Sequence, residues 1–397
     1  MSLEFDVLVV GAGPAGLATA IRSRAEGLTV AVVDGASGPP VDKACGEGLM
    51  PDGVEALRRL GVDPTALDAR PFGGIRYVDG DTVAEGTFPG TPGLGVRRTR
   101  LHAALVERAV EAGVDIRWQV KVTRLVEGPG GSFTALAAPT AAHRRSDRLT
   151  AGAEAAAAAA PLPARFLVGA DGLLSRVRRW AGLGGRPSRS RRFGVRRHLR
   201  VPPVEVPRVV EVWWGDRCEA YVTPVGPEEV GIAMLWDGRT ADFDALLAGF
   251  PRLAARLAGR EVLSRDRGAG PLRQRVRGVV RGNVALVGDA SGYVDAITGE
   301  GLSLAFHQAG ALARALAAGD LAPYAAAQRR LGRLPDGTTR LLLAVERRPF
   351  LRRRAVRALA ADPALFSRLL AVHAREAPLA SLGWSGAARL VWRLARS

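Results

Sequence analysis

A cluster of glycines near the N-terminus has the spacing needed to bind a dinucleotide. The segment reads Gly11-Ala-Gly13-Pro14-Ala15-Gly16. Gly11 permits a tight turn, Gly13 lets the backbone approach a pyrophosphate, and Gly16 lets the following helix pack closely on a strand. The helix start adds free N–H groups and a positive dipole end, which attract phosphates. Asp34 lies 18 residues beyond Gly16, where a carboxylate accepts ribose hydroxyls.

The surrounding pattern supplies the elements that must position these residues. Residues 6–10 form an apolar run that ends at the first glycine, residues 15–26 have helical character, and residues 28–33 form a second buried strand. Gly27 suits the end of the helix. This strand–helix–strand order predicts a βαβ unit and a parallel sheet. The pattern suits NAD or FAD equally.

Two later segments resemble the second and third signatures of the FAD-dependent aromatic hydroxylases. The residues that carry the second signature are Gly169, Asp171, Gly172, Ser175, Val177 and Arg178. The residues that carry the third are Gly288, Asp289 and Ala290, which follow an apolar strand at residues 283–287. The three motifs occur in the order typical of that superfamily. The resemblance therefore implies FAD as the cofactor.

The resemblance also assigns roles to residues around the flavin. Asp289 stands where the aspartate of that superfamily receives the ribityl chain. The next helix start carries Gly299, Gly301 and Leu302, and it would direct N–H groups to the flavin edge that holds negative charge when reduced. Arg98 matches an arginine that contacts the cofactor in the superfamily.

A narrower resemblance lies at residues 42–51, which read Asp-Lys-Ala-Cys-Gly-Glu-Gly-Leu-Met-Pro. This segment is similar to the DKxCGxGLxP segment of the geranylgeranyl reductase family, whose members reduce isoprenoid double bonds with FAD. The likeness implies that Cys45 lies near the flavin on the substrate side, which makes Cys45 a candidate catalytic residue. The alternative is that Cys45 is a small buried side chain without chemistry.

Three features separate this chain from the families that it resembles. The aromatic YxWxFP segment of the reductases is reduced to Tyr-Val-Thr-Pro at residues 221–224, which leaves Tyr221 as a candidate for orienting a substrate. Ala296 replaces the proline that the hydroxylases carry in the third motif. Neither Lys43 nor Lys121 matches the active-site lysine of the flavin halogenases. Chlorination is therefore not expected, whereas oxygenation and reduction stay open.

Composition excludes several other classes of protein. The 397 residues are 47% hydrophobic and 24% charged, which is typical of a chain with a sizeable core. The two cysteines exclude a disulfide framework, and no histidine pair has metal-ligand spacing. The first residues lack a signal-peptide pattern, and no apolar run reaches the roughly 18 residues of a membrane span. We expect a cytoplasmic protein without a bound metal.

The charge is strongly basic and uneven along the chain. The formal net charge is +17, and residues 329–397 carry 15 arginines against four acids, a net of +11. One interpretation is a solvated basic surface of helices. The other is contact with an anionic membrane surface or an acidic partner. No recognition motif supports nucleic-acid binding.

The expected fold class is α/β, with three parts. The ranges expected for a discontinuous Rossmann-like FAD-binding domain are 1–75, 97–185 and 270–330. The ranges expected for a mixed β-sheet that binds the substrate are 76–96 and 186–269. A basic helical segment is expected at 331–397.

Several local features complete the expected organisation. Helices are expected at residues 54–60, 101–112 and 301–316. The C-terminal helices are expected to break at Pro335, Pro349, Pro363 and Pro378. The alanine-rich residues 135–163 suggest an irregular or partly helical surface excursion.

The function that the sequence favours is an FAD-dependent monooxygenase, which uses NAD(P)H and O2 on an aromatic or lipophilic small molecule. The alternative is an FAD-dependent reductase of a carbon–carbon double bond in an isoprenoid or polyene, as the segment around Cys45 implies. Only one dinucleotide motif is present, so NAD(P)H would visit the flavin transiently. The sequence leaves the oligomeric state open.

Overall fold

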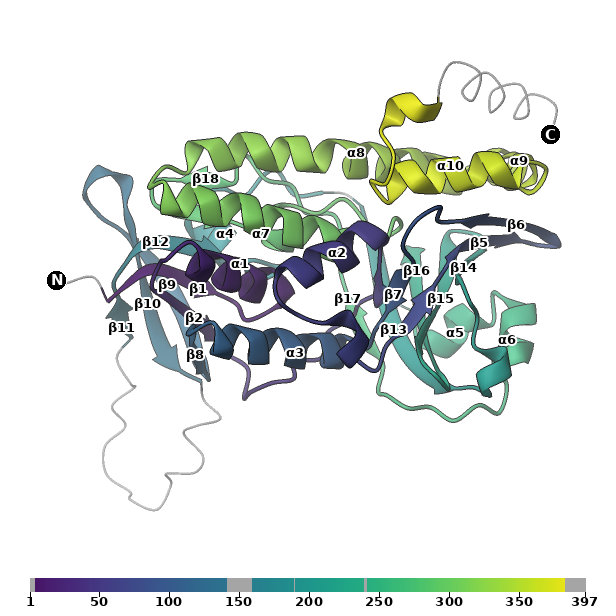
Figure 1. The fold of residues 1–397 in the computed structure, drawn as a ribbon, viewed down its shortest axis with the longest axis horizontal. Coiled ribbons are helices and arrows are strands. Elements are labelled where there is room, and N and C mark those ends of the chain that lie inside the picture. Colours follow the sequence, from purple (N-terminus) through teal and green to yellow (C-terminus); the bar gives the residue numbers. More distant parts are fainter. Residues whose placement is uncertain (1–3, 141–158, 189, 239–240, 383–397) are drawn as a thin grey trace.

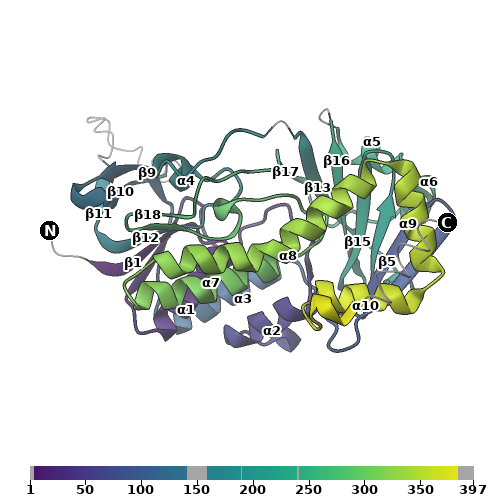
Figure 2. The ribbon, with the colours of Figure 1, turned by 90° about the horizontal axis from the view of Figure 1, so that it is seen from above.

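Two sheets and one long helix organise the molecule. The computed structural model describes residues 4–140, 159–188, 190–238 and 241–382. A parallel sheet lies at one end of the elongated molecule and a mainly antiparallel sheet at the other (Figure 1). Helix α8 (Ala322–Glu346) runs from the first end toward the second (Figure 2).

The parallel sheet forms from short runs of branched apolar residues. Its strands are β1 (Phe5–Val10), β2 (Val30–Asp34), β8 (Asp115–Trp118), β12 (Ala164–Gly169), β18 (Val280–Arg281) and β19 (Val284–Leu286). Their order is β18-β19-β12-β1-β2-β8, and only the edge strand β18 is antiparallel to its neighbour. This order confirms the βαβ unit and the α/β class expected from the sequence.

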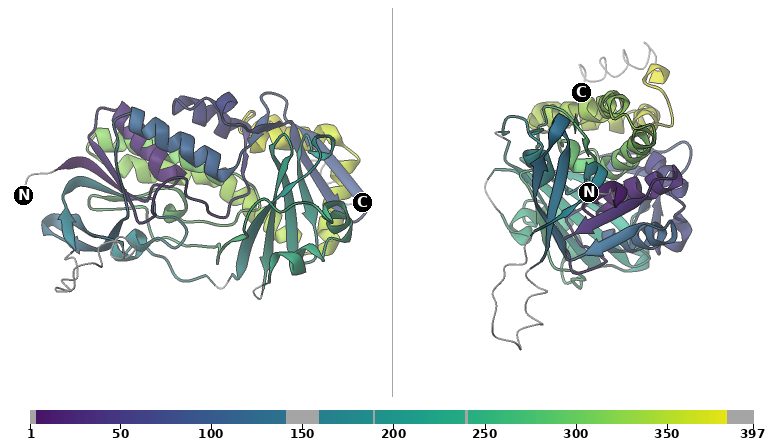
Figure 3. Two further views of the ribbon diagram at one scale, coloured as in Figure 1. Left: turned by 90° about the horizontal axis from the view of Figure 1, so that it is seen from below. Right: turned by 90° about the vertical axis from the view of Figure 1, so that its left-hand side faces the viewer.

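Helices and a small sheet cover the two faces of the parallel sheet. The helices on one side are α1 (Pro14–Ala25), α2 (Pro51–Arg59), α3 (Arg98–Glu111) and α7 (Gly301–Ala317). The small sheet on the other side consists of β9 (Val120–Glu127), β10 (Phe133–Pro139) and β11 (Ala160–Leu162). The end view in Figure 3 shows these layers. α2 and α3 begin three residues earlier than expected, and Pro51 fits the first turn of α2 because no N–H is needed there.

The expectation of an irregular or helical excursion at 135–163 is wrong at both ends of the segment. Residues 135–139 belong to β10, and residues 160–162 form β11, which pairs with β10. Phe133, Ala135 and Ala137 are buried at alternate positions, so strand periodicity places an apolar face against the core. Residues 141–158, the centre of the alanine-rich stretch, lie outside the described residues.

The second sheet has seven strands in the order β17-β13-β16-β15-β14-β5-β6. These strands are β5 (Gly74–Asp79), β6 (Thr82–Thr87), β13 (Arg192–Arg200), β14 (Val210–Trp214), β15 (Cys218–Gly226), β16 (Glu229–Asp237) and β17 (Arg267–Ala269). One face packs on α5 (Phe243–Leu247) and α6 (Pro251–Leu257). The other face packs on α9 (Pro349–Ala360) and α10 (Pro363–His373), so these C-terminal helices cover the sheet.

Three short strands and one short α-helix remain to be placed. They are β3 (Gly48–Leu49), β4 (Arg70–Phe72) and β7 (Gly93–Gly95), which form a small sheet, and helix α4 (Arg176–Trp180).

The expected helix break at Pro335 is wrong, because Pro335 lies inside α8. A proline within a helix leaves the carbonyl four residues earlier without its usual donor. Here that carbonyl, of Leu331, accepts a hydrogen bond from Nη2 of Arg375 at 3.0 Å. Pro349 and Pro363 do mark new helices, since each occupies the first position of one.

Candidate active site

The cofactor motifs meet at one edge of the parallel sheet. The glycine segment follows β1, Asp34 ends β2, Asp171 follows β12, and Gly288 follows β19. The register aligns the last residue of β1 with Val33 and with Gly169. Because the strands are parallel, their carboxyl ends share this edge, which is where open α/β sheets bind ligands.

Glycines bring the backbones of the three motifs into contact. A Cβ atom at Gly11 would lie 2.5 Å from the carbonyl oxygen of Ala170, and one at Gly16 would lie 1.9 Å from the oxygen of Gly11. Gly288 has φ of 60°, and its Cβ would lie 2.7 Å from Cβ of Ala15. Larger residues at these positions would push the motifs apart, so these glycines serve the fold of the site.

Gly13 differs from the other glycines, because it faces open space. The nearest atom to a Cβ at Gly13 is Nη2 of Arg98, at 3.8 Å. Gly13 caps α1 without a side-chain hydrogen bond, and Pro14 occupies the first turn. Nε of Arg98 is buried and has no hydrogen-bond partner among the described residues. The first N–H groups of α1 need an acceptor, and the Arg98 guanidinium lies beside them. Both features fit the pyrophosphate of FAD.

Asp34 and His102 hold the glycine turn from two sides. The Asp34 carboxylate accepts the N–H groups of Ala12 and Ala36, each at 2.8 Å, and each oxygen keeps a lone pair for a ribose hydroxyl. His102 lies one turn after Arg98 on α3, with Nε2 at 2.8 Å from the carbonyl oxygen of Ala12. The N–H of Val41 faces Nδ1, so His102 donates through Nε2. Burial lowers the pKa of His102 and keeps the ring neutral.

The second motif is tied to the third through α4. Both oxygens of Asp171 accept hydrogen bonds at the start of α4, from the Ser175 hydroxyl and from the N–H groups of Arg176 and Val177. Arg178 donates to the carbonyl oxygens of Asp289 and Ala290 at 3.3 and 3.2 Å. Asp171 therefore holds the start of α4, and no atom of a described residue lies within 4 Å of a Cβ added at Gly172.

The third motif presents an acidic group and a helix start. The Asp289 carboxyl accepts no hydrogen bond from a described residue, and burial raises its pKa, although the charges of Arg98, Lys43 and Arg178 oppose the rise. Such an acceptor fits the ribityl hydroxyls of FAD. At the start of α7 the cap residue, Glu300, makes no side-chain capping bond.

Two glycines leave the backbone uncrowded around the start of α7. Gly299 has φ of 70°, and no atom of a described residue lies within 4 Å of a Cβ added there. A Cβ added at Gly301 would lie 3.9 Å from the ring and the hydroxyl of Tyr293. Leu302 is half-buried in the first turn of α7. The helix therefore offers free N–H groups there, as the flavin edge requires.

Cys45 and Tyr293 lie close to this place. Burial raises the pKa of the Cys45 thiol, with the charge of Arg98 opposing the rise and that of Glu47 adding to it. Burial also raises the pKa of Tyr293 well above its usual range, and nearby Asp289 and Cys45 contribute. Sequence analysis missed Tyr293, although an aromatic residue four positions after Asp289 in a cofactor motif is a usable signal.

Tyr221 makes a contact that the sequence did not indicate. Its hydroxyl donates to the carbonyl oxygen of Ile297 at 3.1 Å, which ties β15 to the segment before α7. The hydroxyl proton is therefore held by the backbone, while the ring remains beside the same segment. Among the described residues, no three His, Cys, Asp or Glu side chains are grouped closely enough to hold a metal ion.

Comparisons of the sequence with known proteins point to reductases. The chain is 29% identical to menaquinone reductase of Mycolicibacterium smegmatis over 82% of this chain and 80% of that protein. It is 24% identical to digeranylgeranylglycerophospholipid reductase 3 of Methanosphaera stadtmanae over 79% of this chain and 77% of that protein.

Comparisons of the fold lead to flavoproteins of several activities. A flavoprotein/dehydrogenase of Cytophaga hutchinsonii superposes with a TM-score of 0.80 at 19% identity, over 99% of this chain and all of that one. Aklavinone-11 hydroxylase, solved with FAD and aklavinone, gives 0.63 at 22% identity, over 80% of this chain and 63% of that one. The model of the FAD binding domain family matches residues 4–319. The chain therefore belongs to the FAD binding domain family and is an FAD-dependent oxidoreductase.

Proposed function

We propose that this protein reduces a carbon–carbon double bond of a lipophilic substrate with FAD. The observation that carries the proposal is the place of Cys45, whose thiol lies near Arg98 and Tyr293 beside the start of α7. The two reductases to which the chain is similar support it, because one is named for a lipid with isoprenoid chains. The substrate would therefore be an isoprenoid or polyene.

Different residues of the chain would have different roles in such a reduction. When bound and reduced by NAD(P)H that visits transiently, FAD would supply the hydride for one carbon of the double bond. The other carbon needs a proton, and the Cys45 thiol keeps its proton at neutral pH because burial raises its pKa. Arg98 and the N–H groups at the start of α7 would stabilise the negative charge that reduced FAD carries before the hydride leaves. Solvent then returns a proton to the thiolate.

Monooxygenation is the second candidate function. The fold shared with aklavinone-11 hydroxylase favours it, with an aromatic or lipophilic substrate and with NAD(P)H and O2 as co-substrates. Ala296, which stands where the hydroxylases carry a proline, makes this candidate the weaker of the two.

Substitution of Cys45 separates the two candidates. FAD reduced in the absence of O2 should be reoxidised by menaquinone or by a digeranylgeranyl glycerophospholipid. C45A should slow this reoxidation about 100-fold, as expected for the loss of a general acid, and C45S should slow it less. Stopped-flow absorbance of the flavin measures the rate, and C218A, which removes the buried thiol of β15, serves as the matched control.

The experiment tests both the role of Cys45 and the type of reaction. Reoxidation at the native rate in C45A would remove Cys45 as the proton donor. Substrate-dependent O2 consumption without any anaerobic reoxidation by any lipid tested would reject the reductase and favour the monooxygenase.

We also propose that the C-terminal helices contact an anionic membrane surface. None of the helices in the described ranges has the length and apolar character of a bilayer-spanning segment. At the start of α9, however, Phe350 is 65% exposed and lies among the exposed Arg347, Arg348 and Arg353. An exposed apolar side chain with exposed arginines close to it in the sequence suits a surface of anionic lipids. Residues 383–397 of the basic segment lie outside the described residues.

The membrane proposal predicts a lipid preference. At low salt the protein should co-sediment with vesicles that contain phosphatidylserine and much less with phosphatidylcholine vesicles. F350S should lower binding about threefold or more, because one exposed aromatic side chain is lost from the interface. V204S, which changes another exposed apolar side chain, in the segment between β13 and β14, is the control. Equal binding to both kinds of vesicle would rule the contact out.

A further inference from the structure

Glu47 is a buried acid in an unusual backbone conformation. It lies between Gly46 and Gly48, is 2% exposed and has φ of 60°. A residue with a side chain costs about 1 kcal/mol or more in this left-handed region, so it persists only where its surroundings hold it. Neither the sequence motifs nor the proposed reaction assigns Glu47 a role.

The Glu47 carboxylate is held on both of its oxygens. Oε1 accepts the backbone N–H of Arg98, the first residue of α3, at 2.8 Å. Oε2 faces Nε2 of His198, a fully buried residue of β13. The two partners belong to different parts of the fold, since α3 lies on the parallel sheet and β13 belongs to the seven-stranded sheet. Glu47 therefore joins the two sheets at the active site.

Neighbouring groups fix the direction of the His198 hydrogen bond. Nη1 of Arg196, which can only donate, lies 2.8 Å from Nδ1 of His198. Nδ1 must then accept, so the proton of the ring is on Nε2 and points to Glu47. Asp42 holds Arg196 from its other side and also accepts from Arg267. Ser264 completes the surroundings, with its hydroxyl 2.7 Å from Nδ1.

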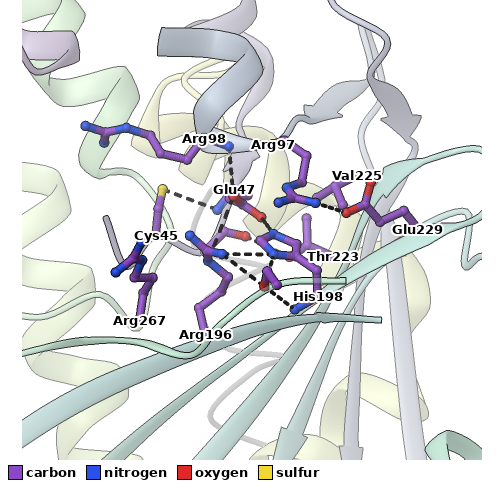
Figure 4. A network of polar contacts seen from close by, with 12 residues as sticks. Cys45, Glu47, Arg97, Arg98, Arg196, His198, Thr223, Val225, Glu229 and Arg267 are labelled. Carbon is purple, nitrogen blue, oxygen red and sulfur yellow. Dashed lines mark hydrogen bonds and ion pairs between the residues drawn. The ribbon is translucent and has the colours of Figure 1, made fainter. Parts of the chain in front are cut away.

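Glu47 contacts two groups of the cofactor site, one through its backbone and one through its carboxylate. The backbone N–H of Glu47 faces Sγ of Cys45 at 3.4 Å, and its side chain holds the first residue of α3. Figure 4 shows Cys45 and the Arg98 guanidinium on one side of Glu47 and His198 on the other. A shift of Glu47 would move both groups relative to a bound flavin.

We propose that Glu47 and His198 are positioning residues that set the places of Cys45 and Arg98 at the flavin. The pair acts through its hydrogen bonds and touches neither substrate nor cofactor. This role goes beyond the proposed reaction, because it holds for reduction and for oxygenation alike.

Glutamine at position 47 tests the pair sharply. A carboxylate accepts on both oxygens, whereas a glutamine side chain accepts on one and donates from the other side. His198 cannot adapt by moving its proton, because Arg196 donates to Nδ1. E47Q therefore loses one of the two bonds in either orientation of its amide. H198L loses the same contact from the other side, whereas H198Q keeps a donor toward Glu47.

The readouts are FAD affinity, the visible spectrum of bound FAD and the alkylation rate of Cys45, measured in a C218S background so that one thiol reacts. E47Q and H198L should each weaken FAD binding and speed alkylation about tenfold, as expected for a lost hydrogen bond to a charged group. Both should shift the flavin spectrum. The double variant should be no worse than either single one, since both remove the same contact.

Two controls decide the result. H198Q should stay within about twofold of the native values, the size of a surface change. D266N, which alters a partly exposed ion pair with Arg197 on the same strand, should do the same. The proposal fails if E47Q and H198L match D266N in all three readouts. If either variant does not fold, H198Q decides, because a tenfold loss in H198Q would also overturn the proposal.

Discussion

The G13V variant should fold as the native chain does and yet be purified without FAD. Within the described part of the chain, the nearest atom to a Cβ at Gly13 is 3.8 Å away, and the residue has φ of −72°, which a branched side chain adopts freely. The added methyl groups would therefore occupy the space expected for the pyrophosphate and obstruct only the ligand. We expect FAD affinity to fall at least about 100-fold, or about 3 kcal/mol.

Flavin absorbance of the purified protein, FAD titration and thermal unfolding without FAD together measure this effect. G16A is the contrast, because its Cβ would lie 1.9 Å from the carbonyl oxygen of Gly11 and should lower stability itself. D34A is less informative, since Asp34 also holds the N–H of Ala12. A G13V protein that retains FAD with native affinity would place the pyrophosphate elsewhere.

The R192M variant should lose about 3–5 kcal/mol of folding free energy, the range measured when one partner of a buried ion pair is removed. Arg192 is 1% exposed and lies against three buried carboxylates, those of Glu219, Asp295 and Glu346. They come from β15, the segment before α7, and α8. Removal of Arg192 leaves three buried acids without their cation, so the seven-stranded sheet, the cofactor motif and α8 all lose one anchor.

The Arg192 cluster should also make the stability of the fold depend on pH. Burial raises the pKa of Glu219 to about 8, although the charge of Arg192 opposes the rise. The folded state then binds more protons than the unfolded state between the ordinary pKa of a glutamate and about 8. Stability should therefore fall as the pH rises through this window. The fall should be steeper in R192M, and it should be shallower in E219Q, which cannot ionise.

Thermal unfolding of the FAD-saturated protein across this pH range checks both statements. R59M is the matched control, because Arg59 is largely exposed and, among the described residues, its side chain pairs with Glu55 of its own helix. A surface pair of that kind contributes at most about 1 kcal/mol. If R192M and R59M unfold at similar temperatures, the Arg192 cluster does not stabilise the fold.

Short segments of the sequence were enough to predict FAD as the cofactor and α/β as the fold class. The glycines at 11 and 16 are required by contacts with backbone a few residues away or across one strand, so their spacing already implies the turn, the helix start and the adjacent strand. The apolar runs before the three motifs likewise imply parallel strands whose ends meet. FAD binding and the α/β class followed from these local requirements. The sequence left oxygenation and reduction open, because both place the reactive chemistry on the flavin.

Only the tertiary structure decided which distant side chains meet. Glu47 and His198 are 151 residues apart, and neither has a neighbour in the sequence that indicates its partner. Arg375 donates a hydrogen bond to the Leu331 carbonyl that Pro335 leaves without its usual donor. Arg375 lies 44 positions from Leu331, and this contact supports a continuous α8 where local rules predict a break. Local preferences fix backbone conformation over a few residues, whereas such contacts depend on the path of the whole chain. The sequence by itself therefore determined the cofactor and the backbone turns that bind it. The packing of the two sheets decided which distant side chains position the active-site residues.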